Sequence, residues 1–132
     1  MNRARVAMCI IVVFALSSCA NNTPRIVTLR TDQSALNTME HISNAAKHCW
    51  FNSHDTKFRH YLLAPELQSY SGRPRILIVP DSAPGERPVL VIEAEGEMSA
   101  KLSAYGPLLN GRDGKVIAND IVHWAKRTGK CR

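Results

Sequence analysis

Four cysteines are the residues of this chain with the most distinctive chemistry. Cys9 lies in an apolar run near the N-terminus and Cys19 follows that run, whereas Cys49 and Cys131 lie at the ends of two segments with helical periodicity. Cys9 and Cys19 belong to the N-terminal region, so Cys49 and Cys131 are the two cysteines of the remaining chain. Two such cysteines in an oxidising compartment pair as a disulfide. A bridge from Cys49 to Cys131 would close a loop of about 82 residues and stabilise the fold by roughly 4–5 kcal/mol. We therefore predict the disulfide Cys49–Cys131.

The histidines near these cysteines suggest two other kinds of site, a nucleophilic thiol activated by a histidine and a metal site. His48 precedes Cys49, but neighbouring residues on a helix point about 100° apart and so do not form a nucleophile–base pair. His41 and His48 are seven residues apart, whereas a helical metal pair prefers a spacing of four. The chain also lacks the Cys-x-x-Cys or His-x-x-x-His element that would complete a zinc site. It has no Gly-x-Ser-x-Gly elbow to hold a nucleophilic serine. We predict no catalytic residue, no metal and no cofactor.

Carboxylates and a glycine-rich loop offer two further candidate sites. Glu93 and Glu95 would share one face of a strand, where paired carboxylates can perform acid–base chemistry or bind a cation. No glycine-anchored calcium loop surrounds them, so we interpret them as a solvated hairpin tip. Residues 110–114 lack the glycine spacing of phosphate-binding loops, which favours a turn and helix cap.

The N-terminus has the three parts of a secretory signal. Arg3 and Arg5 are followed by about ten apolar residues, 7–16, and then by Ser17, Ser18 and Cys19. That apolar run is shorter than the roughly 20 residues that span a bilayer. We expect residues 1–18 to be removed as a signal peptide.

The end of this leader, Leu16-Ser17-Ser18-Cys19, resembles the lipobox of bacterial lipoprotein precursors at all four positions. The resemblance covers residues 1–20 and leaves the remaining domain unrecognised. It implies a diacylglycerol on the Cys19 sulfur, cleavage before Cys19 and acylation of the new amino group. Two or three acyl chains hold a protein on a membrane durably. Ala20 resembles the sorting context of outer-membrane lipoproteins, which implies a lipid anchor at the outer membrane, facing the periplasm.

Ordinary cleavage after Ala20 is the competing interpretation of this leader. Ser18-Cys19-Ala20 fits the small-x-small pattern of signal peptidase sites, and the product would be a soluble periplasmic protein. We favour the lipoprotein because every lipobox position matches.

The remaining chain has the size of one domain. Loss of Arg3 and Arg5 lowers the Lys+Arg count from 17 to 15, against 11 acidic residues, a net charge of +4. These basic residues are spread along the sequence without a cluster, so we expect no nucleic-acid partner. Residues 19–31 are interpreted as the lipidated N-terminus and a tether, in which Ile26, Val27 and Leu29 could add a short edge strand. Residues 32–132 are interpreted as one globular domain.

Apolar periodicity predicts two helices. Residues 32–50 form the first, which Thr31, Asp32 or Ser34 would cap and whose apolar stripe would run from Leu36 to Cys49. Residues 115–128 form the second, with Gly129 as its C-cap. The disulfide would then join the ends of both helices and hold their C-termini together on one side of a sheet.

Between the helices the pattern predicts an antiparallel meander. Residues 57–63 form a strand that Pro65 ends, and residues 75–79 and 88–94 form a hairpin. Residues 98–105 alternate, with Met98 on the buried side and Tyr105 on the wet side. The predicted fold class is α+β, a two-layer sandwich of three or four antiparallel strands with two helices on one face, in the order α-β-β-β-β-α.

Such a layout supports no function by itself. Tyr105, with Leu108 and Leu109 beside it, is the candidate partner surface, because exposed aromatic residues are favoured at protein contacts. We expect a non-enzymatic interaction or assembly module of the cell envelope, bound to the membrane through Cys19 and to an envelope protein. A small envelope ligand-binding or enzyme-inhibitor module is the alternative, and a small hydrolase ranks last.

Overall fold

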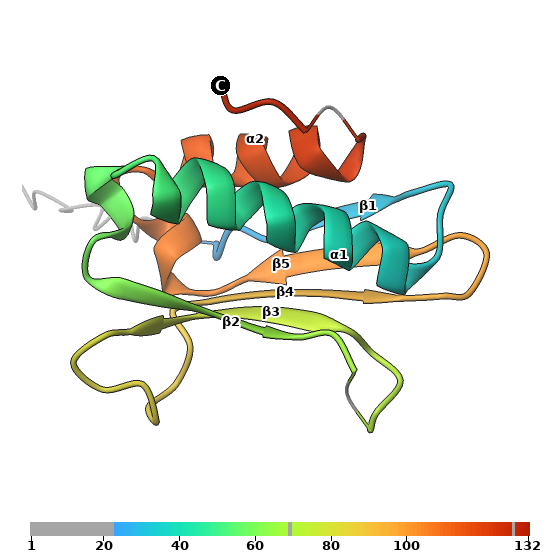
Figure 1. Ribbon diagram of the computed structural model, residues 1–132, viewed down its shortest axis with the longest axis horizontal. Coiled ribbons are helices and arrows are strands. Elements are labelled where there is room, and N and C mark those ends of the chain that lie inside the picture. The colour runs from blue at the N-terminus through green and yellow to red at the C-terminus, as the bar shows by residue number, and fades with distance from the viewer. Residues whose placement is uncertain (1–22, 69, 128) are drawn as a thin grey trace, which may run out of the picture.

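The computed structural model describes residues 23–68, 70–127 and 129–132, and these form an α+β fold, as predicted. Both helices cover the same face of a single sheet (Figure 1). The main elements in chain order are β1 (Val27–Arg30), α1 (Ala35–Ala46), β2 (Tyr61–Glu66), β3 (Arg75–Pro80), β4 (Leu90–Glu95), β5 (Lys101–Tyr105) and α2 (Gly114–Ala125).

The sheet has the strand order β1-β5-β4-β3-β2, and every pairing is antiparallel. Strands β2 to β5 form the predicted meander, whereas β1 adds a fifth strand at the edge, one more than predicted. The edge strand that Ile26, Val27 and Leu29 were expected to allow is therefore present as β1, and the tether does not extend through residues 27–30. Val27 pairs with Ala104 and is buried, so its apolar side chain accounts for the strand.

Strand β2 lies later in the sequence than predicted. Residues 56–58 form a 3₁₀ turn, which Asp55 caps by accepting from the backbone N–H of Lys57 at 3.0 Å. Pro65 lies within β2 instead of ending it. An edge strand tolerates a missing N–H donor, and β2 is the other edge of this sheet.

Helix α1 begins where one of the predicted caps lies. The Ser34 hydroxyl accepts from the backbone N–H of Asn37 at 3.2 Å. The predicted stripe is buried at Met39, Ile42 and Ala46, but Leu36 at its start is 42% exposed. After Ala46 the helix widens into a π-helical turn, Lys47–Asn52, that carries Cys49 into the core.

The expectation that the two helices bring their C-termini together is wrong. Trp50, just after α1, bonds Asp120 in the middle of α2, and Gly129 lies against His41 of α1. The helices are thus antiparallel, and the chain after α2 turns back toward the end of α1 (Figure 1). The turn is made by Arg127, whose φ is 62°, and not by the predicted cap Gly129.

The core fills the space between the sheet and the helices. Leu102 and Ala104 are fully buried, as their alternation predicted, whereas Met98 is 89% exposed. Met98 departs from the pattern because β5 begins at Lys101, after a turn in which Gly96 has φ 121°. The largest fully buried side chains are Trp50, Trp124, Phe58, Met39, Ile42, Ile76, Ile78, Leu90, Ile92, Leu102, Leu109 and Ile117.

Candidate functional site

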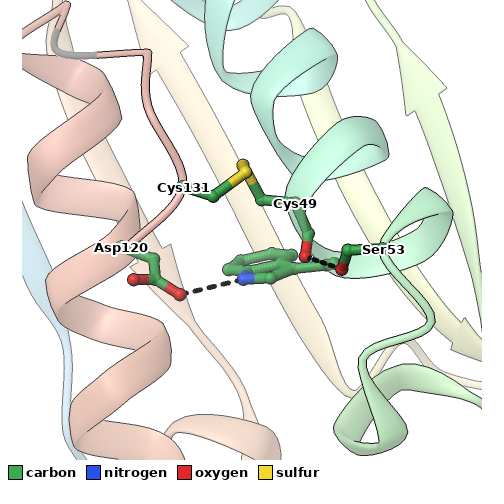
Figure 2. Close-up of a disulfide and its surroundings, with 5 residues drawn as sticks. Cys49, Ser53, Asp120 and Cys131 are labelled. Carbon is green, nitrogen blue, oxygen red and sulfur yellow. Dashed lines mark hydrogen bonds between the residues drawn. A yellow bond between two sulfur atoms is a disulfide. The ribbon is translucent and has the colours of Figure 1, made fainter.

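The predicted disulfide joins the π-helical turn after α1 to the C-terminal tail. Cys49 and Cys131 have their Cα atoms 5.4 Å apart, and the bridge lies above an indole that reaches toward α2 (Figure 2). The Ser53 hydroxyl donates a hydrogen bond to the backbone carbonyl of Cys49. Carbonyls at the end of a helical segment have no partner within the helix, so this bond satisfies one of them. The bridge therefore fastens the tail to the end of α1.

An aromatic cluster lies directly beneath this bridge. Trp50 stacks on Phe58 with ring centroids 4.5 Å apart and contacts Trp124 at 4.7 Å. Its indole N–H donates to Asp120 Oδ2 at 3.0 Å (Figure 2). This bond satisfies the polar atom of a buried aromatic residue and links the two helices.

A cavity of about 230 Å³ opens beside the cluster, lined by the disulfide, Trp50, Trp124, Asp120 and the ion pair of Asp55 with Lys57. Ligand pockets for drug-sized molecules usually measure about 300–1,000 Å³. The cavity is thus suited to a small group at most.

The sheet face opposite the helices, which we call the open face, carries a row of apolar side chains across four strands. The cross-strand register places Ala64 beside Leu77, Leu77 beside Val91 and Val91 beside Tyr105. Leu62, 46% exposed, extends this row along the edge strand. The row consists of Leu62, Ala64, Leu77, Val91 and Tyr105, each of them half-buried or exposed. Val79, which pairs with Leu62 on the same face, is buried.

A row of polar residues runs beside the apolar row on the same face. Glu66 lies beside Arg75, Arg75 beside Glu93 and Glu93 beside Ser103. Arg75 forms an ion pair with Glu66, and Arg73 forms one with Glu95 at 3.0 Å. The open face therefore carries an apolar row with a charged row along one side of it, and apolar residues next to polar ones are common at protein contacts.

Tyr105 connects the two rows. Burial, and then the negative charge of Glu93, raise the pKa of the Tyr105 phenol above its ordinary value, while Arg75 opposes the shift. Glu93 also bonds the phenol. Glu93 and Glu95 do share a face as predicted, but they contact different partners and do not form a carboxylate pair.

Only one of the three predicted partner-surface residues is on this surface. Tyr105 is 39% exposed, whereas Leu109 is fully buried and Leu108 packs against the core. The prediction for Leu109 is wrong because residues 107–110 form a 3₁₀ turn that folds the Leu109 side chain inward. Sequence reasoning missed Leu77 and Val91, although their continuous apolar runs on β3 and β4 were the available signal.

The histidines and carboxylates do not converge. Within residues 23–68, 70–127 and 129–132, no three His, Cys, Asp or Glu side chains are grouped to hold a metal ion. His41 Nε2 is buried without a hydrogen-bond partner, against Gly129. In the same described part of the chain, no helix has the length and apolarity to cross a membrane. The lipobox, Cys19 included, lies outside the described residues.

The arrangement defines an α+β two-layer sandwich with an open sheet face. No known protein family matches the chain, and no curated protein or solved structure matches it significantly.

Proposed function

We propose that this protein is a non-enzymatic interaction module of the bacterial cell envelope, held through lipid on Cys19 at the periplasmic side of the outer membrane. The resemblance of Leu16-Ser17-Ser18-Cys19 to a lipobox supports the anchor. The disulfide supports an oxidising compartment, since such bridges persist outside the cytosol. The open face supports the interaction.

One observation carries the interaction part of this proposal. The helices bury one face of the sheet, while the opposite face presents a continuous apolar row with Leu62 and Tyr105 exposed at its two ends. A contiguous exposed apolar surface with a polar border is typical of a protein contact. The partner is therefore an envelope protein with an apolar patch that packs against this row.

A second candidate function is binding of a small envelope ligand, and the cavity beneath the disulfide favours it. Trp50 and Trp124 supply apolar walls, and Asp120 and Lys57 supply polar groups. The cavity of about 230 Å³ lies below the usual range for ligand sites, so this candidate ranks second.

Replacement of Cys19 tests the anchor. Cys19→Ser removes the sulfur that would carry diacylglycerol, so the protein should leave the membrane fraction and lose incorporation of labelled fatty acid. Labelling that persists in Cys19→Ser would contradict lipidation at Cys19, and unchanged membrane fractionation would contradict the lipid as the anchor.

The interaction is tested by two matched leucine variants. Leu62→Glu places a charge on the open face, and Leu36→Glu places the same charge on α1, at exposures of 46% and 42%. Affinity capture from native membranes, with mass spectrometry, should recover a partner with the wild type and with Leu36→Glu. Leu62→Glu should lose it. Equal recovery by both variants would contradict the assignment of the open face.

A further inference from the structure

The two central strands of the open face, β3 and β4, carry charges of opposite sign. Arg75 on β3 lies beside Glu93 on β4. Arg73, two residues before Arg75, forms an ion pair with Glu95 of β4 at 3.0 Å, and both side chains are exposed. The charged residues of the open face are therefore basic along β3 and acidic along β4.

This arrangement is complementary to itself about one twofold axis. The axis runs parallel to the strands, midway between β3 and β4, and brings two open faces together so that β3 of one copy lies over β4 of the other. Arg75 then meets Glu93 of the second copy, and Arg73 meets Glu95. Each contact occurs twice, because a twofold interface uses the same surface on both subunits.

The apolar row matches itself about the same axis. Leu77 of one copy then lies over Val91 of the other, and Ala64 of β2 lies over Tyr105 of β5. The small side chain of Ala64 leaves room for the ring. Two sheets with aligned strands pack about 10 Å apart, with the side chains of both faces interdigitated between them.

Neighbouring twofold axes are less favourable for this face. An axis along β4 would place Glu93 over its own equivalent, and an axis along β3 would do the same for Arg75, so like charges would face each other. A shift by one strand toward β1 would lay Arg75 over Thr28, which lies beside Ser103 in the polar row. An axis across the strands, placed along the apolar row, would lay Arg75 over the buried Val79.

The axis parallel to the strands also suits two copies anchored in one membrane. The chain enters the domain at the end of the sheet where β1 begins, and the backbone N–H of Arg25 donates to Asn110 Oδ1 there at 2.7 Å. Rotation about an axis parallel to the strands leaves this end of both copies on the same side. An axis across the strands would point the two chain entries in opposite directions.

We propose that the open face binds a second copy of this chain, about a twofold axis that runs parallel to the strands between β3 and β4. This inference rests on the proposed function, because it names the partner of the same face. The envelope protein that packs against the apolar row is then the protein itself.

Reversal of one charge in each copy tests this pairing. Arg75→Glu alone makes both central positions acidic and Glu93→Arg alone makes both basic, so neither variant should self-associate. Mixed in equal amounts, the two variants should form one-to-one pairs, because every acidic group then meets a basic one. Native mass spectrometry of the lipidated protein in detergent micelles measures both results, and circular dichroism shows that each variant is folded.

Matched charge reversals on the helices serve as controls. Glu40→Arg on α1 and Lys115→Glu on α2 change exposed positions on the other side of the molecule. Both control variants should self-associate as the wild type does. Self-association of folded Arg75→Glu or Glu93→Arg at the wild-type level would overturn the charge pairing, as would the absence of mixed pairs from two folded variants.

Photo-crosslinking of the protein with both charges intact does not depend on the folding of these variants. A photoreactive residue at position 105 should give an adduct of twice the chain mass, joined to β2 near Ala64. In a mixture of heavy-nitrogen and unlabelled copies, crosslinked peptides of mixed label show that the join lies between two copies. A join between copies at α1 or α2 would overturn the axis.

The identity of the adduct separates failure of this inference from failure of the proposed function. An adduct of position 105 with a different protein would overturn the second copy as the partner and would leave the open face as a binding surface. No adduct from position 105 would contradict the open face as a binding surface, and this inference with it.

Discussion

At the residue scale, Tyr105 and Asp120 define the two polar contacts that matter most. Tyr105 places a phenol at the junction of the apolar and polar rows. Asp120 accepts a hydrogen bond from the N–H of the buried Trp50 indole. The sequence indicated that Tyr105 faces outward, because alternation along a strand determines its side. It did not indicate Asp120 or Glu93 as partners, because such contacts depend on strand register and helix direction.

The raised pKa of Tyr105 makes a prediction about alkaline pH. The folded protein holds the phenol proton to a higher pH than the unfolded chain does. The stability from this contact is therefore fully present below pH about 10 and is lost as the pH rises through the raised pKa. Glu93→Gln should lower the Tyr105 pKa, because it removes a negative charge. Titration of the Tyr105 ring by NMR measures this, and a higher pKa in the variant would contradict the contact.

Asp120 makes a prediction about stability. Asp120→Ala leaves the Trp50 indole N–H buried without a partner, so the free energy of unfolding should fall by about 1–3 kcal/mol. Asp120→Asn keeps an acceptor oxygen and should lose less. Urea unfolding of both variants measures the difference, and equal losses would show that the hydrogen bond is not the cause.

At the element scale, local patterns predicted most helices and strands but not their directions or edges. Ser34, the Met39–Cys49 stripe and the alternation at Leu102 and Ala104 were sufficient to place their elements. The predictions for Pro65 and for Gly129 as a helix cap were wrong because each depends on the surroundings. Pro65 lies on an edge strand, and the left-handed turn after α2 is made by Arg127. β1 was ambiguous since its apolar residues fit both a tether and a strand.

Two glycines provide a matched test of how α2 is joined to the rest of the domain. At Gly114 a Cβ would lie 1.9 Å from the Leu109 carbonyl oxygen, whereas at Gly85 it would meet nothing within 4 Å. Gly114→Ala should therefore lower the free energy of unfolding by about 1–3 kcal/mol. Gly85→Ala should change it by no more than about 0.5 kcal/mol. Thermal unfolding measures both, and equal stability of the two variants would contradict the packing at Gly114.

At the scale of the whole molecule, the disulfide closes the structure by fastening the tail across two antiparallel helices. Its pairing followed from the cysteine count, whereas its path, back from the end of α2, did not follow from local periodicity. The two bridge positions are 82 residues apart. An uncovered sheet face followed from the prediction of two helices on one side, whereas the row of residues on it depends on the strand register.

Removal of this bridge should lower stability without changing the fold class. The double substitution Cys49→Ser and Cys131→Ser removes a closed loop that the chain-entropy model values at about 4–5 kcal/mol. Urea unfolding should show a loss of up to that size, with helix and strand content preserved at low denaturant. An unchanged midpoint would contradict the stabilising role of the bridge.

The most direct test of the central claim, that the open face binds an envelope protein, is photo-crosslinking in living cells. A photoreactive aromatic residue replaces Tyr105 on the open face or, as a control, Val116, an exposed residue of α2. We expect one discrete membrane-fraction adduct from position 105, lost with Leu62→Glu, and none from position 116. The same adduct from both positions, or none from position 105, would contradict it.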